Sequence, residues 1–462
     1  MNAESHKIKI HFIGVGGIGM SGIAEILIHM GYKVSGSDMS PSHNTEKLQK
    51  IGAEIYIGHS EENIKDANIV VYSSAIPQSN PEYSYANKEN IPLLRRAEML
   101  AEIMRLKQGI AIAGTHGKTT TTSILATILK ESNLNPTYAI GGIVENLKGH
   151  ASIGTGTYFV AEADESDGSF LLLSPLYSVI TNIDDDHLDH YGTSEDIFKA
   201  FLKFANKVPF YGLCALNGND EKVLELRKKL KKPYVLFGIS NDSSEFDYCA
   251  SNLRYENGVQ VYDLYYEGKK AEEITLNLPG DHNVSNSLGA IAIAHKVGLG
   301  FDTIRLGISK FQGVGRRFQT LVKKNGFELI DDYGHHPTEI EKTIKALRNK
   351  VGDERVVVFF EPHRFTRTRD CWNQFLHCFN LADKVYMAPI YAASEKPLTG
   401  INSERLKDDV NKLHPELIET LSNMDEMFEK LNLLQNEKVH VITLGAGSIG
   451  RKIRDWVIEN NK

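Results

Sequence analysis

The feature that most constrains this chain is a turn rich in glycine and threonine that follows a short apolar segment. Residues 110–113, Ile-Ala-Ile-Ala, are typical of a buried strand, and beyond the turn isoleucine and leucine recur at helical spacing over 124–129. A strand, a glycine turn and a helix in this order bring free backbone N–H groups and the positive end of the helix dipole to one place, which favours an anion. The turn consists of Gly114, Thr115, His116, Gly117, Lys118, Thr119 and Thr120.

The residue types in this turn suit the phosphates of ATP. The glycines let the backbone approach a phosphate, Lys118 can neutralise the outer phosphates, and the Thr119 hydroxyl can ligate Mg²⁺. The spacing, Gly-x-x-Gly-Lys-Thr, is shorter than in the standard phosphate-binding loop. A helix start capped by threonines is the alternative, but a cap leaves the lysine unexplained.

Length and composition narrow the class of protein. The 462 residues suffice for about three domains, and no apolar run is long enough to span a membrane. The net charge of −7 argues against nucleic acid as a partner. The four cysteines form no C-x-x-C pair and residues 1–9 are polar, so we expect a cytoplasmic protein without a disulfide framework, a zinc site or a secretory signal.

A second glycine turn, near the N-terminus, predicts a diphosphate site. It follows a predicted strand at 7–13, precedes a predicted helix, and has an acidic residue about twenty positions further on. Alone it suggests NAD, but a nucleotide-diphosphate sugar satisfies the same chemistry, and glycines that only pack a helix on a strand remain an alternative. The predicted strand at 69–77 contains two serines. The candidates here are Gly14, Gly16, Gly17, Gly19, Asp38, Ser73 and Ser74.

Acidic side chains follow two predicted strands of the central region. Residues 158–161 run into a cluster that starts at Glu162, and 179–183 run into one that contains His187. Ligands of open parallel sheets collect at the carboxyl ends of strands, so both clusters can meet the phosphate loop and hold Mg²⁺. Each cluster taken alone is also compatible with a solvated loop.

The region after residue 213 has a different pattern. Asn257-Gly258 between two alternating segments predicts a hairpin, and hence a small antiparallel sheet over 213–275. A helix then begins near residue 281, and Asn283 and Asn286 share one face of it. Asparagine can pair with the edge of adenine, although helix capping explains Asn283 equally well.

The last third of the chain again places polar groups after strands, here with a cationic set. Predicted strands at 327–330 and 356–360 end in such groups, and the strand at 439–444 runs into a Gly-x-Gly-x-x-Gly turn that predicts a strand–helix junction rather than another cofactor site. The polar candidates are Arg316, Asp331, Asp332, Tyr333, His335, His363, Arg364 and Arg367.

These patterns predict an α/β protein of three domains. We expect a Rossmann-like N-terminal domain over 1–107, a central P-loop ATPase domain with a parallel sheet and a small antiparallel sheet over 108–313, and a Rossmann-like C-terminal domain over 314–462. A phosphate loop, an acidic metal set and a diphosphate site together favour an ATP-driven joining reaction, in which a carboxylate becomes an acyl phosphate that an amine attacks.

The motifs also resemble those of the Mur ligases of bacterial cell-wall synthesis, over nearly the whole chain. The shortened loop at 114–120 is similar to the ATP loop of that family. Further similar segments are 14–22, 73–77, 162–167, 331–337 and 362–367. Ser448 departs from the family pattern, which usually has aspartate there, as do Gly168 and Asp281.

The resemblance implies a reaction and its ligands. It implies ligation of L-alanine to the carboxylate of UDP-N-acetylmuramate with ATP and Mg²⁺, by a monomer or weak homodimer without nucleic-acid partners or membrane insertion. The N-terminal candidates would then hold the UDP-sugar instead of NAD. Alternatives are a family member that attaches a recycled tripeptide to the same sugar nucleotide, an NAD-dependent oxidoreductase, and a non-catalytic nucleotide-binding protein.

The resemblance also assigns roles to residues. ATP contacts would come from the loop at 114–120 together with Asn283, Asn286, Arg316 and one of Asp331 and Asp332. The metal ligands would be Thr119, Glu162 and His187, and the amino-acid site Tyr333, His335, His363, Arg364 and Arg367. The catalytic set would be Lys118, Glu162, His187, His335 and His363.

Overall fold

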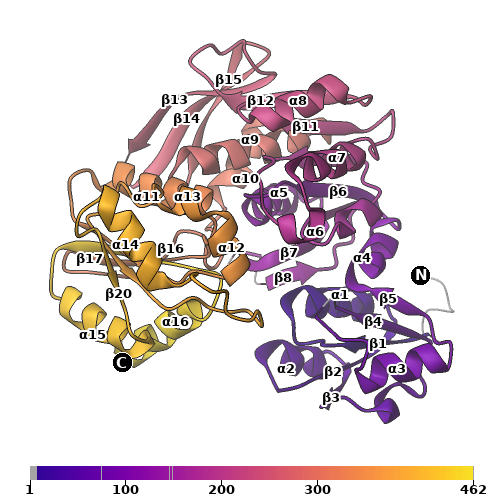
Figure 1. The fold of residues 1–462 in the computed structure, drawn as a ribbon. Helices are drawn as coiled ribbons and strands as arrows, with labels where there is room; N and C mark the ends of the chain where they lie inside the picture. Colours follow the sequence, from indigo (N-terminus) through magenta and orange to yellow (C-terminus); the bar gives the residue numbers. More distant parts are fainter. Residues whose placement is uncertain (1–7, 74, 145, 148, 257, 461–462) are drawn as a thin grey trace. The chain divides into compact units, whose positions relative to one another are not determined.

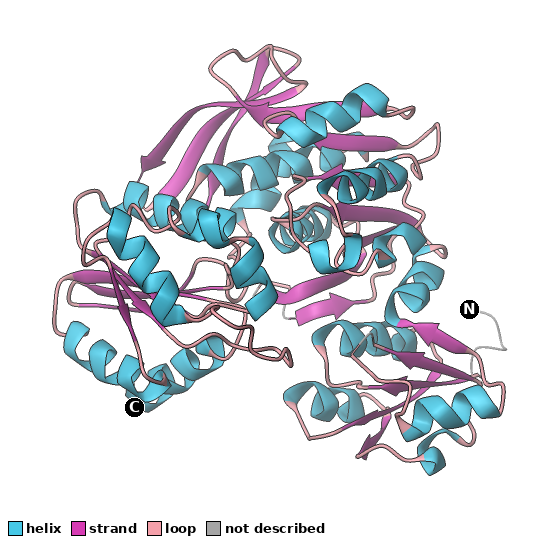
Figure 2. Ribbon diagram, in the orientation of Figure 1, coloured by secondary structure: helices cyan, strands magenta, loops and turns pink. Residues whose placement is uncertain are grey.

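The computed structural model describes residues 8–73, 75–144, 146–147, 149–256 and 258–460, and these form three sheets with flanking helices (Figure 1). Helices alternate with strands through most of the chain (Figure 2). The chain divides into two compact units: unit 1 is Met1–Ala250, Leu264–Glu272 and Ser285–Phe311, and unit 2 is Ser251–Asp263, Glu273–Val284 and Gln312–Lys462. The predicted three-domain α/β architecture is confirmed, while the domain limits at 107 and 313 stay predictions. None of the helices in the described ranges has the length and apolarity required to cross a membrane.

The first sheet is parallel and has the strand order β3-β2-β1-β4-β5. Side chains alternate between its faces: Ile10 and Phe12 join the core under α1 and α2, while Ile13 and Val70 join the core under α3. Its elements are β1 (Lys9–Ile13), α1 (Ile18–His29), β2 (Lys33–Asp38), α2 (His43–Lys50), β3 (Glu54–Ile57), η2 (Glu61–Ile64), β4 (Ile69–Tyr72), α3 (Pro81–Lys88), β5 (Leu93–Arg95) and α4 (Arg96–Met104).

The chain reverses its direction across this sheet beside β1. It runs from β1 outward through β2 to β3, then returns to β4 on the other side of β1. In open α/β sheets a ligand binds at such a switch point, outside the carboxyl ends of the strands. The glycine turn after β1 and the turn after β4 both lie there, and Ile76 would be 3.4 Å from a Cβ atom on Gly14.

A buried carboxylate holds β2 in the position that the glycine turn needs. Glu82 is fully buried, accepts from Ser37 Oγ at 2.5 Å and Asn63 Nδ2 at 2.7 Å, and lies 3.5 Å from His11 Nε2. Burial alone would raise the pKa of Glu82, but the adjacent His11 and the hydrogen bonds from Ser37 and Asn63 outweigh burial and lower the pKa to about 2. The backbone carbonyl of Ser37 in turn accepts from the N–H of Gly14 at 2.8 Å.

We therefore expect Glu82→Gln to lower the free energy of unfolding by about 3 kcal/mol at pH 7. Because the folded pKa of about 2 lies below the ordinary 4.5, the charged carboxylate stabilises the fold above pH 4.5, and this stabilisation is lost as the pH falls toward 2. Denaturant unfolding at pH 7 and at about pH 3.5 measures the difference. Glu89→Gln, an exposed substitution at the end of α3, is the matched control, and an equal loss in both variants would contradict the prediction.

The second sheet has ten strands in the order β15-β14-β13-β12-β11-β10-β6-β9-β7-β8. The predicted hairpin strands at 253–255 and 259–262 are present in β13 and β14, and they extend this large sheet; Asn257 lies outside the described residues. Its elements are β6 (Gln108–Ala113), α5 (Lys118–Glu131), β7 (Thr137–Val144), β8 (Gly149–Ser152), β9 (Tyr158–Glu162), η3 (Ser169–Leu172), β10 (Tyr177–Ile180), α6 (Leu188–Tyr191), α7 (Ser194–Ala205), β11 (Leu213–Asn217), α8 (Glu221–Lys229), β12 (Tyr234–Ile239), β13 (Tyr248–Glu256), β14 (Val259–Tyr266), β15 (Lys269–Leu276), α9 (Asp281–Lys296) and α10 (Phe301–Ser309).

Strand β6 lies between β10 and β9, and it pairs with both in parallel. Its residues 110–113 are fully buried, as expected for a parallel strand with helices on both faces. The acidic segments that follow β9 and β10 therefore flank the phosphate loop that follows β6. The predicted meeting of these three segments is confirmed.

The third sheet belongs to unit 2 and has the order β16-β17-β21-β18-β19-β20, parallel except for β16. Val358 and Phe360 face one core cluster, and Val357 and Phe359 face the other. Its elements are β16 (Gln319–Lys324), β17 (Phe327–Asp332), α11 (Pro337–Val351), β18 (Val356–Phe360), α12 (Phe365–Asp370), α13 (Trp372–Phe375), β19 (Lys384–Met387), α14 (Ser403–Leu413), β20 (Ile418–Thr420), α15 (Met424–Leu434), β21 (Val439–Leu444) and α16 (Ile449–Asn460).

Candidate active site

The loop between β6 and α5 requires both of its glycines. Gly114 has a φ of +138° and Gly117 a φ of +85°, which L side chains rarely adopt. A Cβ atom on Gly114 would lie 1.9 Å from Thr181 Oγ1, and one on Gly117 would lie 2.3 Å from Asn286 Oδ1. Only glycine at positions 114 and 117 allows the backbone to adopt this conformation.

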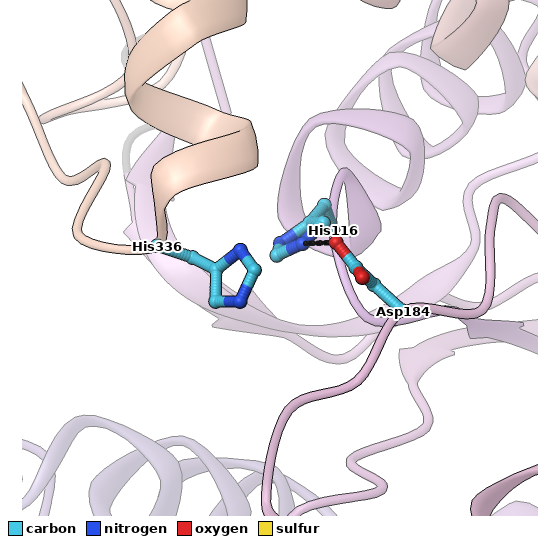
Figure 3. A group of neighbouring side chains, drawn as sticks. All are labelled: His116, Asp184 and His336. Carbon is cyan, nitrogen blue, oxygen red and sulfur yellow. Dashed lines mark hydrogen bonds and ion pairs between the residues drawn. The ribbon is translucent and has the colours of Figure 1, made fainter. Parts of the chain in front are cut away.

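The segment after β10 holds the loop in place. The backbone N–H of His116 donates to Asn182 Oδ1 at 2.9 Å, and Thr181 Oγ1 donates to the His116 carbonyl at 2.6 Å. The N–H of Asp184 donates to Thr115 Oγ1 at 2.9 Å. Figure 3 shows the side-chain pair between His116 and Asp184, whose Nε2 and Oδ2 atoms are 3.2 Å apart. These hydrogen bonds fix the path of the loop.

Lys118, the first residue of α5, folds back over the loop. Its Nζ donates to the carbonyl oxygens of Gly114 at 2.6 Å and Thr115 at 3.1 Å, and it lies 2.7 Å from Glu165 Oε2. Burial would lower the pKa of Lys118, but nearby carboxylates, first Glu165, outweigh burial and raise it. The ammonium is thus charged and lies where it can receive a phosphate.

Glu165 was not singled out by the sequence. Burial raises the pKa of its carboxyl to about 7, against the opposing attraction of Lys118. The acidic run at 162–167 predicts several carboxylates near the loop, but nothing in it identifies the one that pairs with the lysine. That identity depends on how the loop after β9 bends back toward α5.

Glu162 and Thr119, which the family resemblance assigns to a metal site, are in direct contact. Thr119 Oγ1 donates to Glu162 Oε2 at 3.1 Å, and the N–H of Gly141 donates to Glu162 Oε1 at 2.6 Å. A hydroxyl and a carboxylate at this distance are the hard oxygen donors that Mg²⁺ prefers. These two residues therefore fit a magnesium ion.

His187 has a left-handed backbone with a φ of 57°, directly before α6. Its Nε2 lies 4.0 Å from Glu165 Oε1 and 3.6 Å from Asp186 Oδ2. The structure thus places the histidine beside a second carboxylate of the 162–167 loop. The assignment of His187 as a metal ligand stays a prediction.

The two asparagines of α9 differ in their surroundings. Asn286 borders the phosphate loop, because its Oδ1 would lie 2.3 Å from a Cβ atom on Gly117. Asn283 is buried and donates from Nδ2 to the Pro279 carbonyl at 2.8 Å. A contact of either residue with adenine stays a prediction.

The first glycine turn of unit 1 has a separate set of contacts. Gly14 has a φ of +80°, and the N–H of Gly16 donates to Asp38 Oδ2 at 2.8 Å. The glycine turn and Asp38 therefore lie side by side, and a contact of either with a sugar nucleotide stays a prediction. Ser73 follows β4 at the switch point, and Ser74 lies outside the described residues.

Arg96 is a second residue that the sequence did not indicate. Its Nη1 would lie 2.7 Å from a Cβ atom on Gly19, and its Nη2 donates to Asp164 Oδ2 at 3.2 Å. It comes from α4, far along the chain from the glycine turn, so no local pattern could reveal this approach.

In unit 2 the two aspartates after β17 point inward. Asp331 is fully buried, lies 3.4 Å from Arg316 Nε and accepts from Thr443 Oγ1 at 3.2 Å. Asp332 accepts from the N–H groups of Phe318 and Gly334, both at 2.7 Å. Burial raises the pKa of both, to about 6 for Asp332. They fix the loops around them, and a contact with ATP stays a prediction.

Three of the five residues predicted to bind the amino acid, Tyr333, His335 and His363, form a row of rings in unit 2. Tyr333 and His335 make an edge contact with centroids 5.4 Å apart, and His335 and His363 another at 5.7 Å. Tyr391, which the sequence analysis missed, stacks on His363 at 5.6 Å. Arg367 Nη1 lies 3.2 Å from His363 Nδ1. Four of the five predicted residues are therefore adjacent.

The fifth, Arg364, precedes α12 with a φ of 71°, and its N–H donates to the Tyr391 carbonyl at 2.9 Å. Ser448 has a clear partner: its Oγ donates to Glu361 Oε1 at 2.6 Å, while the N–H of Ile449 donates to Glu361 Oε2 at 3.0 Å. Glu361 thus supplies the carboxylate at the start of α16, where the family pattern usually has an aspartate.

Comparison with known proteins decides the family. Family profiles match residues 9–138 (Mur ligase family, catalytic domain), 112–294 (Mur ligase middle domain) and 316–447 (Mur ligase, glutamate ligase domain). The UDP-N-acetylmuramate–L-alanine ligase of Trichlorobacter lovleyi is 47% identical over 442 residues, 96% of each chain. This chain belongs to the Mur ligase family. The resemblance of its motifs is thereby confirmed.

Solved structures agree with this assignment. The UDP-N-acetylmuramate–alanine ligase of Thermotoga maritima matches the Mur ligase described here with a TM-score of 0.83 and 30% identity, covering 98% of this chain and 99% of that one. The murein peptide ligase of Psychrobacter arcticus matches with a TM-score of 0.71 and 22% identity, covering 97% and 98%. The second likeness shows the fold alone.

Proposed function

We propose that this Mur ligase joins L-alanine to the carboxylate of UDP-N-acetylmuramate and converts ATP to ADP and phosphate as it does so. The observation that carries the proposal is the identity of 47% over 96% of both chains with a ligase of that name. The shaped phosphate loop, with Lys118 and Glu162 in place, supports the ATP-dependent part. An NAD-dependent oxidoreductase would leave both residues without a role.

The chemistry follows from the weakness of a carboxylate as an electrophile. A carboxylate oxygen of the sugar nucleotide attacks the γ-phosphorus of ATP, and ADP leaves, which gives an acyl phosphate. The amine of alanine then attacks the carbonyl carbon and expels phosphate, while a base takes the amine proton. Lys118 lies where it can offset the negative charge of the transferring phosphoryl group.

Thr119, Glu162 and His187 would hold magnesium in this proposal. These residues would supply the hard oxygen and imidazole ligands, and a bound ion would neutralise part of the phosphate charge. The protein residues align the outer phosphate with the loop, because the N–H groups at the start of α5 and the Lys118 ammonium converge on one point.

We assign the amino acid to the row of rings in unit 2. Arg364 or Arg367 would pair with the carboxylate of alanine, since guanidinium groups bind carboxylates in a bidentate way. His335 or His363 would take up the amine proton, because a neutral imidazole can act as a base near pH 7. Tyr391 would support His363 by stacking.

An assay of ADP release tests the proposal. With UDP-N-acetylmuramate and Mg²⁺ present, we expect L-alanine to start ADP release and the tripeptide L-alanyl-γ-D-glutamyl-meso-diaminopimelate to have no effect. If ADP were released with the tripeptide and not with alanine, the protein would instead be assigned to the ligases that attach the tripeptide. The cytoplasmic location and the monomeric or weakly dimeric state stay predictions.

A further inference from the structure

Arg96 begins α4 directly after β5, and its guanidinium fills the space beside Gly19. A Cβ atom at position 19 would lie 2.7 Å from its Nη1. Gly19 belongs to the first turn of α1, which has no acidic residue, and Gly17 before it provides no side-chain cap. A cation at the positive end of a helix is unfavourable unless an anion lies nearby. The placement of Arg96 is therefore explained only together with its anionic partners.

One such partner belongs to the acidic loop of the second sheet. Arg96 Nη2 donates to Asp164 Oδ2 at 3.2 Å, and Asp164 Oδ1 accepts from the N–H of Ser166 at 3.1 Å. In the sequence Asp164 lies between Glu162 and Glu165, which both contact the phosphate loop. Arg96 thus touches both the first glycine turn and the acidic loop of the ATP site.

This pair is loose enough to accept a further anion. The side chains of Arg96 and Asp164 are 32% and 40% exposed, so solvent screens their attraction and the pair alone is weak. A guanidinium has five N–H donors in a plane, which lets it serve two anions at once.

We propose that Arg96 is a positioning residue: it contacts the diphosphate of a bound sugar nucleotide while it keeps its hydrogen bond to Asp164. In this way it couples occupancy of the first glycine turn to the acidic loop of the ATP site. The inference rests on the proposed function, because it takes the sugar nucleotide as the ligand of that turn. Coupling of this kind is reciprocal, so each substrate tightens the binding of the other.

Calorimetry of the whole protein tests this coupling. The dissociation constant of UDP-N-acetylmuramate is measured with and without Mg²⁺ and a non-hydrolysable ATP analogue, and the ratio of the two values reports the coupling. In the wild type we expect a ratio clearly above one. Arg96→Gln is expected to weaken sugar-nucleotide binding by about 10- to 100-fold and to bring the ratio to one.

Two further variants separate the contacts of Arg96. Arg96→Lys keeps the charge but not the planar fork, so we expect part of the affinity to return without the coupling. Asp164→Asn should leave the affinity for the sugar nucleotide within about threefold and still remove the coupling. Arg105→Gln is the control, since Arg105 follows the same helix and its Nη1 pairs with the exposed carboxylate of Glu102, with Oε1 at 2.6 Å.

The outcomes are distinguishable. A ratio of one in the wild type, or the same ratio in Arg96→Gln and the wild type, would overturn the role of Arg96, as would equal losses in Arg96→Gln and Arg105→Gln. If the wild type still forms amide from alanine in that case, the proposed function stands and only the coupling fails. If the wild type does not bind the sugar nucleotide at all, the proposed function fails first.

Discussion

Lys118→Ala is expected to lower the rate of amide formation by at least about 10³-fold, because it removes the positive charge that faces the transferring phosphoryl group. In the structure this ammonium lies on the carbonyls of Gly114 and Thr115 and against Glu165, at the start of α5. Binding of UDP-N-acetylmuramate in the absence of nucleotide should remain within about threefold of wild type, since the first glycine turn has its own hydrogen bonds. Product formation and calorimetry measure the two effects.

Lys130→Ala serves as the control for this substitution. Lys130 lies in the last turn of the same helix, α5, so its loss changes the net charge equally without touching the loop. We expect it to leave both the rate and the affinity unchanged. A loss of sugar-nucleotide affinity in Lys118→Ala that matches its loss of rate would contradict the assignment of the two glycine turns to different substrates.

Glu162→Gln is expected to raise the Mg²⁺ concentration needed for half-maximal activity by about 10- to 100-fold. The amide retains the size of the side chain and the capacity to accept from the N–H of Gly141, but it loses the negative charge that a divalent cation requires. A magnesium titration of the initial rate, at saturating ATP and alanine, measures this change.

Asp185→Asn is the matched control for the metal titration. Asp185 belongs to the acidic segment after β10, but its Oδ1 pairs with Lys222 at 2.5 Å, so its charge is already compensated. We expect its magnesium requirement to stay at the wild-type value. If Glu162→Gln also keeps that value, Glu162 is not a metal ligand.

Local sequence patterns were sufficient to predict the strands, the glycine turns and the residues that follow them. The apolar segment at 110–113, the two glycines and Lys118 lie within nine positions, so their joint geometry follows from a strand, a turn and a helix. The same holds for Gly16 and Asp38, because the register of β1 and β2 brings the end of one strand beside the end of the other.

The site residues that the sequence analysis did not identify make contacts with residues far away in the sequence. Arg96 approaches Gly19 and Asp164, Glu165 pairs with Lys118, and Tyr391 stacks on His363. Each contact depends on how a loop crosses from one strand to another, which periodicity does not encode. A charged or aromatic residue in a loop has the same composition signal whether it faces solvent or a site.

Transfer of oxygen tests the central claim of an acyl phosphate most directly. UDP-N-acetylmuramate labelled with ¹⁸O in its carboxylate is incubated with ATP, Mg²⁺, L-alanine and the wild-type protein, and the released phosphate is analysed by mass spectrometry. The account predicts that one labelled oxygen enters each phosphate released, because the carboxylate oxygen that attacks the γ-phosphorus leaves with it. Phosphate without label, formed together with the amide, would contradict the account.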